Sequence, residues 1–142
     1  MQAVTPHARD PLARILVADD HDDTRDMLAT LLGRAGHEVT LAIDGDQALR
    51  LYRRDPPDVV LLDIFMPLKD GLETLMELRD EFPNARVIAM SAGWQSRPLG
   101  AIGAPPDVLH QADVLGADLT IAKPIEPAAL LAAIATALTL RR

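Results

Sequence analysis

Residues 59–62 read Val59-Val60-Leu61-Leu62, an aliphatic run with no polar break, and Asp63 follows it directly. We expect a strand over Asp58–Leu62. A strand that is apolar at every position has to be covered on both faces, which is typical of a parallel sheet between two helix layers. The run therefore predicts an α/β fold with Asp63 at the carboxyl end of an inner strand.

The same alternation of strand and helix continues on both sides of this run. Each short β-prone stretch is followed by apolar residues at helical spacing, which gives five strand–helix pairs. Asp22 or Asp23 is expected to cap the first helix, and Gly36 to take a left-handed conformation after it. The other strands are expected at Arg14–Ala18, Glu38–Ile43, Arg86–Met90 and Leu119–Ala122, and the later helices at Asp46–Arg54, Gly71–Phe82, Val108–Leu115 and from Pro127.

Polar side chains capable of chemistry follow four of the five expected strands. Ligands of open α/β sheets bind beyond the carboxyl ends of the strands, so we expect these side chains to meet at one rim. They are Asp19 and Asp20, Asp63, Ser91 and Lys123.

Three carboxylates at one rim repel one another, and the repulsion is relieved either by a raised pKa of one of them or by a bound divalent cation. Hard oxygen ligands favour Mg²⁺, which is commonly held by one or two carboxylates together with a phosphate oxygen. Asp63 is the candidate nucleophile for a phosphoryl group. Lys123 and the metal would neutralise its charge, and Ser91 would donate to a further phosphoryl oxygen.

Composition bounds the class of protein. A chain of 142 residues that is 49% hydrophobic has the size and composition of one domain. We expect a flexible N-terminal tail over residues 1–13 and the folded domain over residues 14–142. The net charge of −7 argues against nucleic acid or an anionic membrane as a partner. The absence of cysteine excludes disulfides and suits a cytoplasmic location.

Five motifs in register carry a family resemblance that spans Arg14 to Leu140. The chain resembles the response-regulator receiver family of two-component signalling systems. The motifs are Leu16-Val17-Ala18-Asp19-Asp20, Asp44-Gly45-Asp46-Gln47-Ala48-Leu49, Asp58 through Gly71, Met90-Ser91-Ala92 and Ala122-Lys123-Pro124.

The resemblance implies a flavodoxin-like, doubly wound, five-stranded parallel sheet of order 2-1-3-4-5 with five helices. It implies that a histidine kinase or phosphotransfer protein phosphorylates Asp63, and that the Lys123–Pro124 bond is cis. Asp20 would bind Mg²⁺ directly, Asp19 through water, and Phe65 through its backbone carbonyl. Output would come from an unknown downstream protein, with the chain a monomer or a phosphorylation-dependent dimer.

The sequence departs from the family pattern in two places. Thr120 stands where many receivers carry an aromatic ring in the fifth strand, so any switch would use other packing. The loop over residues 92–107, which contains Trp94, is about ten residues longer than usual, and long loops in compact domains tend to be functional. Phe65 is expected at the mouth of the site, where it would slow hydrolysis of the phosphorylated form.

Three functions remain open at this point. The leading one is a single-domain response regulator that is not an enzyme beyond its own phosphorylation and dephosphorylation. A receiver cut from a larger kinase or regulator is the second. A haloacid-dehalogenase-like phosphatase is less favoured, because such enzymes need a second acid where this chain has Phe65. The four histidines lack metal-ligand spacing; His21, directly after the acid pair, is interpreted as a solvated loop residue that could tune the charge of the site.

Overall fold

The computed structural model describes residues 12–66, 71–92 and 116–140 of the chain. The expected helix at Val108–Leu115, residues 93–107 with Trp94, and motif residues 67–70 lie outside these ranges. The elements are β1 (Arg14–Ala18), α1 (Asp22–Arg34), β2 (Glu38–Ala42), α2 (Gly45–Arg54), β3 (Val59–Asp63), α3 (Gly71–Glu81), β4 (Val87–Ala92), β5 (Leu119–Lys123) and α5 (Pro127–Leu138).

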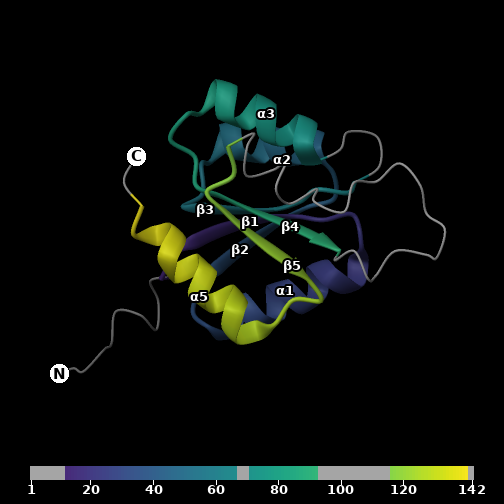
Figure 1. Ribbon diagram of the computed structural model, residues 1–142, viewed down its shortest axis with the longest axis vertical. Coiled ribbons are helices and arrows are strands. Elements are labelled where there is room, and N and C mark those ends of the chain that lie inside the picture. Colours follow the sequence, from purple (N-terminus) through teal and green to yellow (C-terminus); the bar gives the residue numbers. More distant parts are fainter. Residues whose placement is uncertain (1–11, 67–70, 93–115, 141–142) are drawn as a thin grey trace.

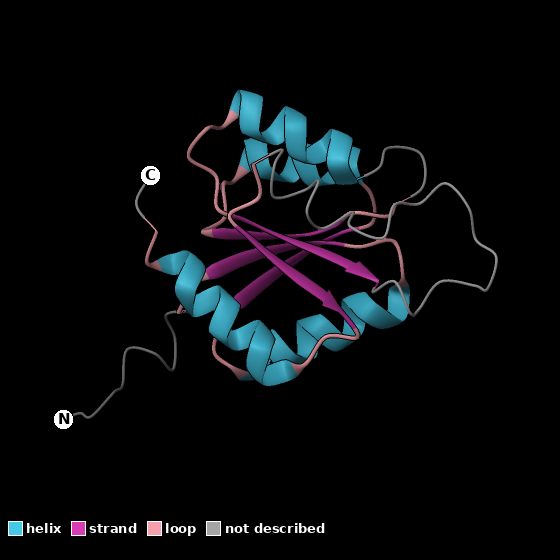
Figure 2. Ribbon diagram, viewed as in Figure 1, coloured by secondary structure: helices cyan, strands magenta, loops and turns pink. Residues whose placement is uncertain are grey.

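The five strands form one parallel sheet in the order β2-β1-β3-β4-β5, which confirms the flavodoxin-like topology. Figure 1 shows α1 and α5 on one face of the sheet and α2 and α3 on the other. The same three layers are visible in Figure 2, with the strands between the two helix layers. Of the five helices expected, four lie within the described ranges.

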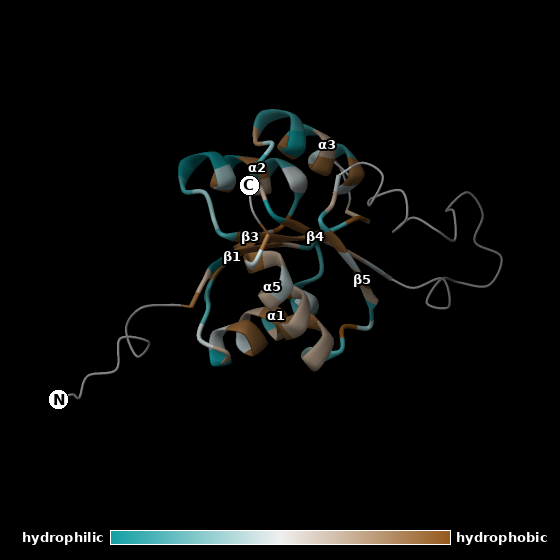
Figure 3. Cartoon of the chain, turned by 60° about the vertical axis from the view of Figure 1, so that its left-hand side comes forward, coloured by the Kyte–Doolittle hydropathy of each residue, from teal (hydrophilic) through white to brown (hydrophobic). Residues whose placement is uncertain are grey.

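The two faces of the sheet bury two separate apolar clusters. Val60 and Leu62 of β3 point toward α2 and α3, whereas Val59 and Leu61 pack on the side of α1 and α5. All four are at most 1% exposed, which accounts for the unbroken aliphatic run in the sequence. Figure 3 shows the hydrophobic strands through the middle of the molecule, with hydrophilic stretches in α2 and α3 on one side and the mostly apolar α5 on the other.

The start of α1 differs from the expectation. Its N-cap is His21, without a side-chain cap hydrogen bond, and Asp22 and Asp23 lie in the first helical turn. Acidic side chains there still favour the positive end of the helix dipole, so the acidic pattern correctly marked the helix start but not the cap. Gly36 has φ +98°, as predicted for the residue that ends this helix.

The connection from β3 to α3 requires a glycine. A Cβ on Gly71 would lie 2.1 Å from the backbone oxygen of Asp63 and 2.4 Å from Cα of Ile64. The Gly71 N–H donates to the carbonyl of Ile64 at 2.8 Å. The helix therefore starts directly against the backbone that carries Asp63, which fixes the end of β3.

Candidate phosphorylation site

The carboxyl ends of the strands bring three predicted residues into contact. Lys123, the last residue of β5, places Nζ 2.7 Å from Oδ2 of Asp19 and 3.5 Å from Oδ2 of Asp63. Asp19 follows β1 and Asp63 ends β3, and they are 0% and 1% exposed. Residues separated by up to 104 positions thus form one buried cluster of charge.

Ser91 reaches the same edge through the register of the sheet. Asp63 is paired with Met90, so Ser91 lies one residue beyond it on β4, and Ser91 is paired in turn with Ala122. Ser91 is 0% exposed. Its hydroxyl therefore belongs to the buried end of the sheet, where we expected a donor.

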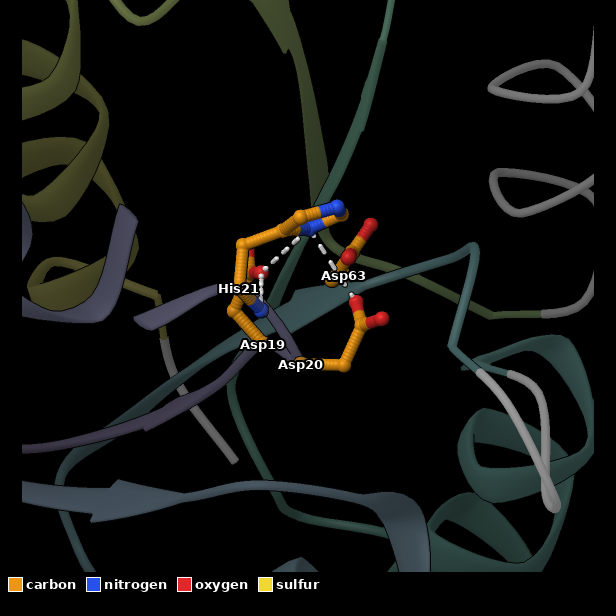
Figure 4. Close-up of side chains that lie close together, drawn as sticks. All are labelled: Asp19, Asp20, His21 and Asp63. Carbon is orange, nitrogen blue, oxygen red and sulfur yellow. Dashed lines mark hydrogen bonds and ion pairs between the residues drawn. The ribbon is translucent and has the colours of Figure 1, made fainter. Parts of the chain in front are cut away.

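The turn after β1 is held by backbone contacts. Asp19 Oδ1 accepts a hydrogen bond from the His21 N–H at 2.9 Å, and the Asp19 carbonyl accepts one from Arg25 Nη1 at 2.7 Å. The first of these bonds orients the Asp19 carboxylate toward the backbone of His21 (Figure 4). The guanidinium of Arg25 also pairs with Asp22 on the same helix.

The environment of Asp63 makes its charged form costly. Burial is the largest cause, and the negative charge of Asp19 adds to it, so that the pKa of Asp63 rises from 3.8 to about 7. The Lys123 ammonium and the Phe65 N–H, which donates to Oδ1 at 3.1 Å, oppose this rise. A cation bound beside the carboxylates would remove much of the repulsion.

The donor set fits a hard divalent cation. Ligand atoms of Asp19, Asp20, His21 and Asp63 all lie within 4.8 Å of one another. Within the described residues, Asp20 Oδ1 is buried and has no hydrogen-bond partner. Its ion-pair contact is with Nδ1 of His21 at 3.2 Å. Buried carboxylate oxygens normally accept a hydrogen bond, so this oxygen among crowded acids is available to a cation such as Mg²⁺.

Three features expected from the sequence can be located. The Lys123–Pro124 peptide bond is cis, as the family resemblance implied. Phe65, two residues after Asp63, is 37% exposed, so its place at the mouth of the site stays a prediction. Thr120 is exposed on β5.

His21 and Arg25 were not identified as site residues from the sequence. The His21 ring is 67% exposed, in keeping with a loop residue, yet its Nδ1 lies 3.3 Å from Asp19 and 3.2 Å from Asp20. Arg25 follows His21 by four positions, so both lie on one side of the first helical turn. That spacing, directly after an acid pair, is the signal that could have indicated their contact with the site.

Comparison with known proteins gives a consistent family. Residues 15–135 match the family model of the response regulator receiver domain. The chain is 34% identical over 123 residues to the chemotaxis protein CheY of Thermotoga maritima, covering 85% of this chain and 93% of that protein. The crystal structure of the receiver domain of NtrX from Brucella abortus matches with a TM-score of 0.77 at 32% identity, covering 89% of this chain and 99% of that one.

Other relatives are much longer than the matched region. The regulatory protein AtoC of Escherichia coli is 44% identical over 79 residues, and the match covers 17% of AtoC and 56% of this chain. A match to the probable transcriptional regulator ycf27 of Guillardia theta covers 41% of that protein. No helix among the described residues is both long and apolar enough to cross a membrane. With its fold, its cluster of acids and lysine, and these matches, the chain belongs to the response-regulator receiver family.

Proposed function

We propose that this chain is a phosphoacceptor switch in which Asp63 takes a phosphoryl group from a histidine kinase or phosphotransfer protein. The observation that carries the proposal is the contact of Lys123 with both Asp19 and Asp63 at the carboxyl edge of the sheet. An ammonium held by two buried carboxylates is positioned to neutralise the charge of a phosphoryl group attached to Asp63.

Each site residue has a role in the proposed transfer. An oxygen of Asp63 forms a bond to phosphorus while the bond between phosphorus and the donor's histidine nitrogen breaks, and the imidazole leaves. Oδ1 is held by the Phe65 N–H, whereas Oδ2 lies on the Lys123 side. Lys123 and the Ser91 hydroxyl would hold two of the phosphoryl oxygens.

The carboxylates would hold the cation that the transfer needs. We assign Asp20 and Asp63 as direct ligands of Mg²⁺, with Asp19 acting through water and Phe65 through its backbone carbonyl. When bound, Mg²⁺ would offset the negative charge of the incoming phosphoryl group. The buried Asp20 oxygen, which accepts no hydrogen bond, supports this assignment.

The proposed output is binding, without turnover of an external substrate. Phosphorylation changes the charge at the end of the sheet and shifts the balance between two conformations that downstream proteins distinguish. We propose a fold over residues 14–142 that acts as a single-domain regulator in the cytoplasm, as a monomer or a phosphorylation-dependent dimer.

Acetyl phosphate and Mg²⁺ test the proposal without a cognate kinase. The intact mass should increase by one phosphoryl group in the wild-type protein, and should not increase in Asp63→Asn or in the presence of EDTA. Asp58→Asn is a matched control, because Asp58 also flanks β3 but lies at its other end. Labelling of Asp63→Asn to the wild-type extent would refute the proposal.

A further inference from the structure

The imidazole of His21 lies against both members of the acid pair. Its Nδ1 is 3.3 Å from Oδ1 of Asp19 and 3.2 Å from Oδ1 of Asp20 (Figure 4). The ring is 67% exposed, so polar attraction to the carboxylates, and not burial, orients it toward them. His21 thus adds a nitrogen to a cluster that is otherwise made of carboxylate oxygens.

The spacing of these atoms suits the ligands of one metal ion. Neighbouring ligands of an octahedral ion are about 3 Å apart when each is about 2.1 Å from the metal. The 3.2 Å separation between His21 Nδ1 and Oδ1 of Asp20, the assigned direct ligand, is close to that value, and the Asp63 carboxylate lies within the same 4.8 Å group. Neutral imidazole can carry its proton on Nε2 and present the lone pair of Nδ1 to a cation.

We propose that His21 is a nitrogen ligand of the cation site, and that it shifts the preference of this receiver toward transition-metal dications such as Mn²⁺, Co²⁺ and Ni²⁺. Mg²⁺ binds oxygen and keeps its waters, so a nitrogen ligand does little for it. Imidazole binds transition metals well, so its contribution is selective. This inference rests on the proposed function, because it assumes a cation site beside Asp63.

A competing role for His21 makes a different prediction. If the ring only donates a hydrogen bond to the carboxylates, it orients the oxygen ligands and supports every metal to the same degree. A direct ligand, by contrast, changes the ratio of Ni²⁺ affinity to Mg²⁺ affinity. The ratio therefore separates the two roles even though both depend on the same contacts.

Isothermal titration calorimetry of the untagged chain with NiCl₂ and with MgCl₂ tests the proposal. His21→Asn should lower the Ni²⁺ affinity by at least about tenfold, the lower end of the loss seen for outer-shell partners. Its Mg²⁺ affinity should change little, which also shows that the variant is folded. Asp20→Asn should weaken both metals and thereby identify the binding event that belongs to this site.

His37→Asn is the matched control. His37 follows the far end of α1, whose thirteen residues place it about 20 Å from His21 along the helix axis. Its replacement should leave the ratio of Ni²⁺ to Mg²⁺ affinity unchanged.

Three results would overturn the inference: an equal loss of both affinities in His21→Asn, no loss of either, or a wild-type protein that binds Ni²⁺ no more tightly than Mg²⁺. In each case Mg²⁺-dependent phosphorylation of Asp63 could still occur, and the proposed function would stand. A wild-type chain that is not phosphorylated at all would count against the proposed function instead.

Discussion

Replacing Asp63 by Asn should stabilise the metal-free protein at neutral and alkaline pH. The carboxyl group has a pKa of about 7 in the folded state against 3.8 when unperturbed. The folded state therefore binds more protons than the unfolded state between these pH values, and stability falls as the pH rises from about 4 to about 7. Above pH 7 the difference of about three between the folded and unfolded pKa values lowers the free energy of unfolding by about 4 kcal/mol.

The effect should depend on pH in a defined way. Urea unfolding with EDTA should show Asp63→Asn more stable than wild type by about 4 kcal/mol at pH 8 and by about 2 kcal/mol at pH 5. Asp26→Asn, an exposed acid on α1, should differ from wild type by less than about 0.5 kcal/mol at both pH values. Excess Mg²⁺ should narrow the gap at pH 8, because only the wild type keeps the acceptor carboxylate as a ligand.

The reasoning would be refuted by an Asp63→Asn variant that is less stable than wild type at pH 8, or by a difference that does not change between pH 5 and pH 8. A less stable variant would mean that Lys123 and the Phe65 N–H stabilise the charged carboxylate more than burial and Asp19 penalise it. A difference that is independent of pH would mean that these effects cancel.

Three further predictions concern Gly71 and Phe65 near the site and Arg79 at the opposite edge of the sheet. In urea unfolding, Gly71→Ala should lower the free energy of unfolding by about 3 kcal/mol, because the added Cβ would lie 2.1 Å from the backbone oxygen of Asp63. Gly33→Ala in α1 is the control: its added Cβ has no atom within 4 Å, so the free energy of unfolding should rise by about 0.5–1 kcal/mol. Phe65→Ala should shorten the life of the phosphorylated form several-fold, as measured by loss of label from purified protein, because water then reaches Asp63 more easily; an unchanged lifetime would count against this role. Arg79→Ala should destabilise the fold by about 2–4 kcal/mol, because Arg79 donates two hydrogen bonds to the Gly116 carbonyl and one to Ala85; a loss below about 1 kcal/mol would contradict this anchoring role.

The fold follows from the sequence because five apolar runs alternate with helical patterns. The strand ends were shifted by one or two residues, since hydrogen bonding to a neighbour does not stop where the apolar pattern stops. Asp63 remains paired with Met90, and Lys123 with Ala92, so both belong to strands although their side chains are polar. The polarity of Asp63, Ser91 and Lys123 led to the expectation that they follow the strands, whereas the structure pairs all three within the sheet.

The sequence predicted which residues meet at the carboxyl edge of the sheet where their position depends only on the ends of the strands. Asp19, Asp63 and Lys123 had to converge once the strand order was known. The contact of His21 with the acid pair depends on the backbone turn after β1 and on the orientation of one ring, neither of which spacing reveals. Gly71 was expected to start a helix, which is confirmed, but the close approach of α3 to β3 that requires a glycine there depends on three-dimensional packing.

The central claim is that Asp63 itself forms the acyl phosphate. Reduction of the acetyl phosphate-treated protein with borohydride converts a phosphorylated aspartate into homoserine, which peptide mass spectrometry locates at a single residue. We predict that homoserine replaces Asp63, and that Asp19 and Asp20 remain unmodified. Homoserine at another aspartate, with Asp63 intact, would contradict the account.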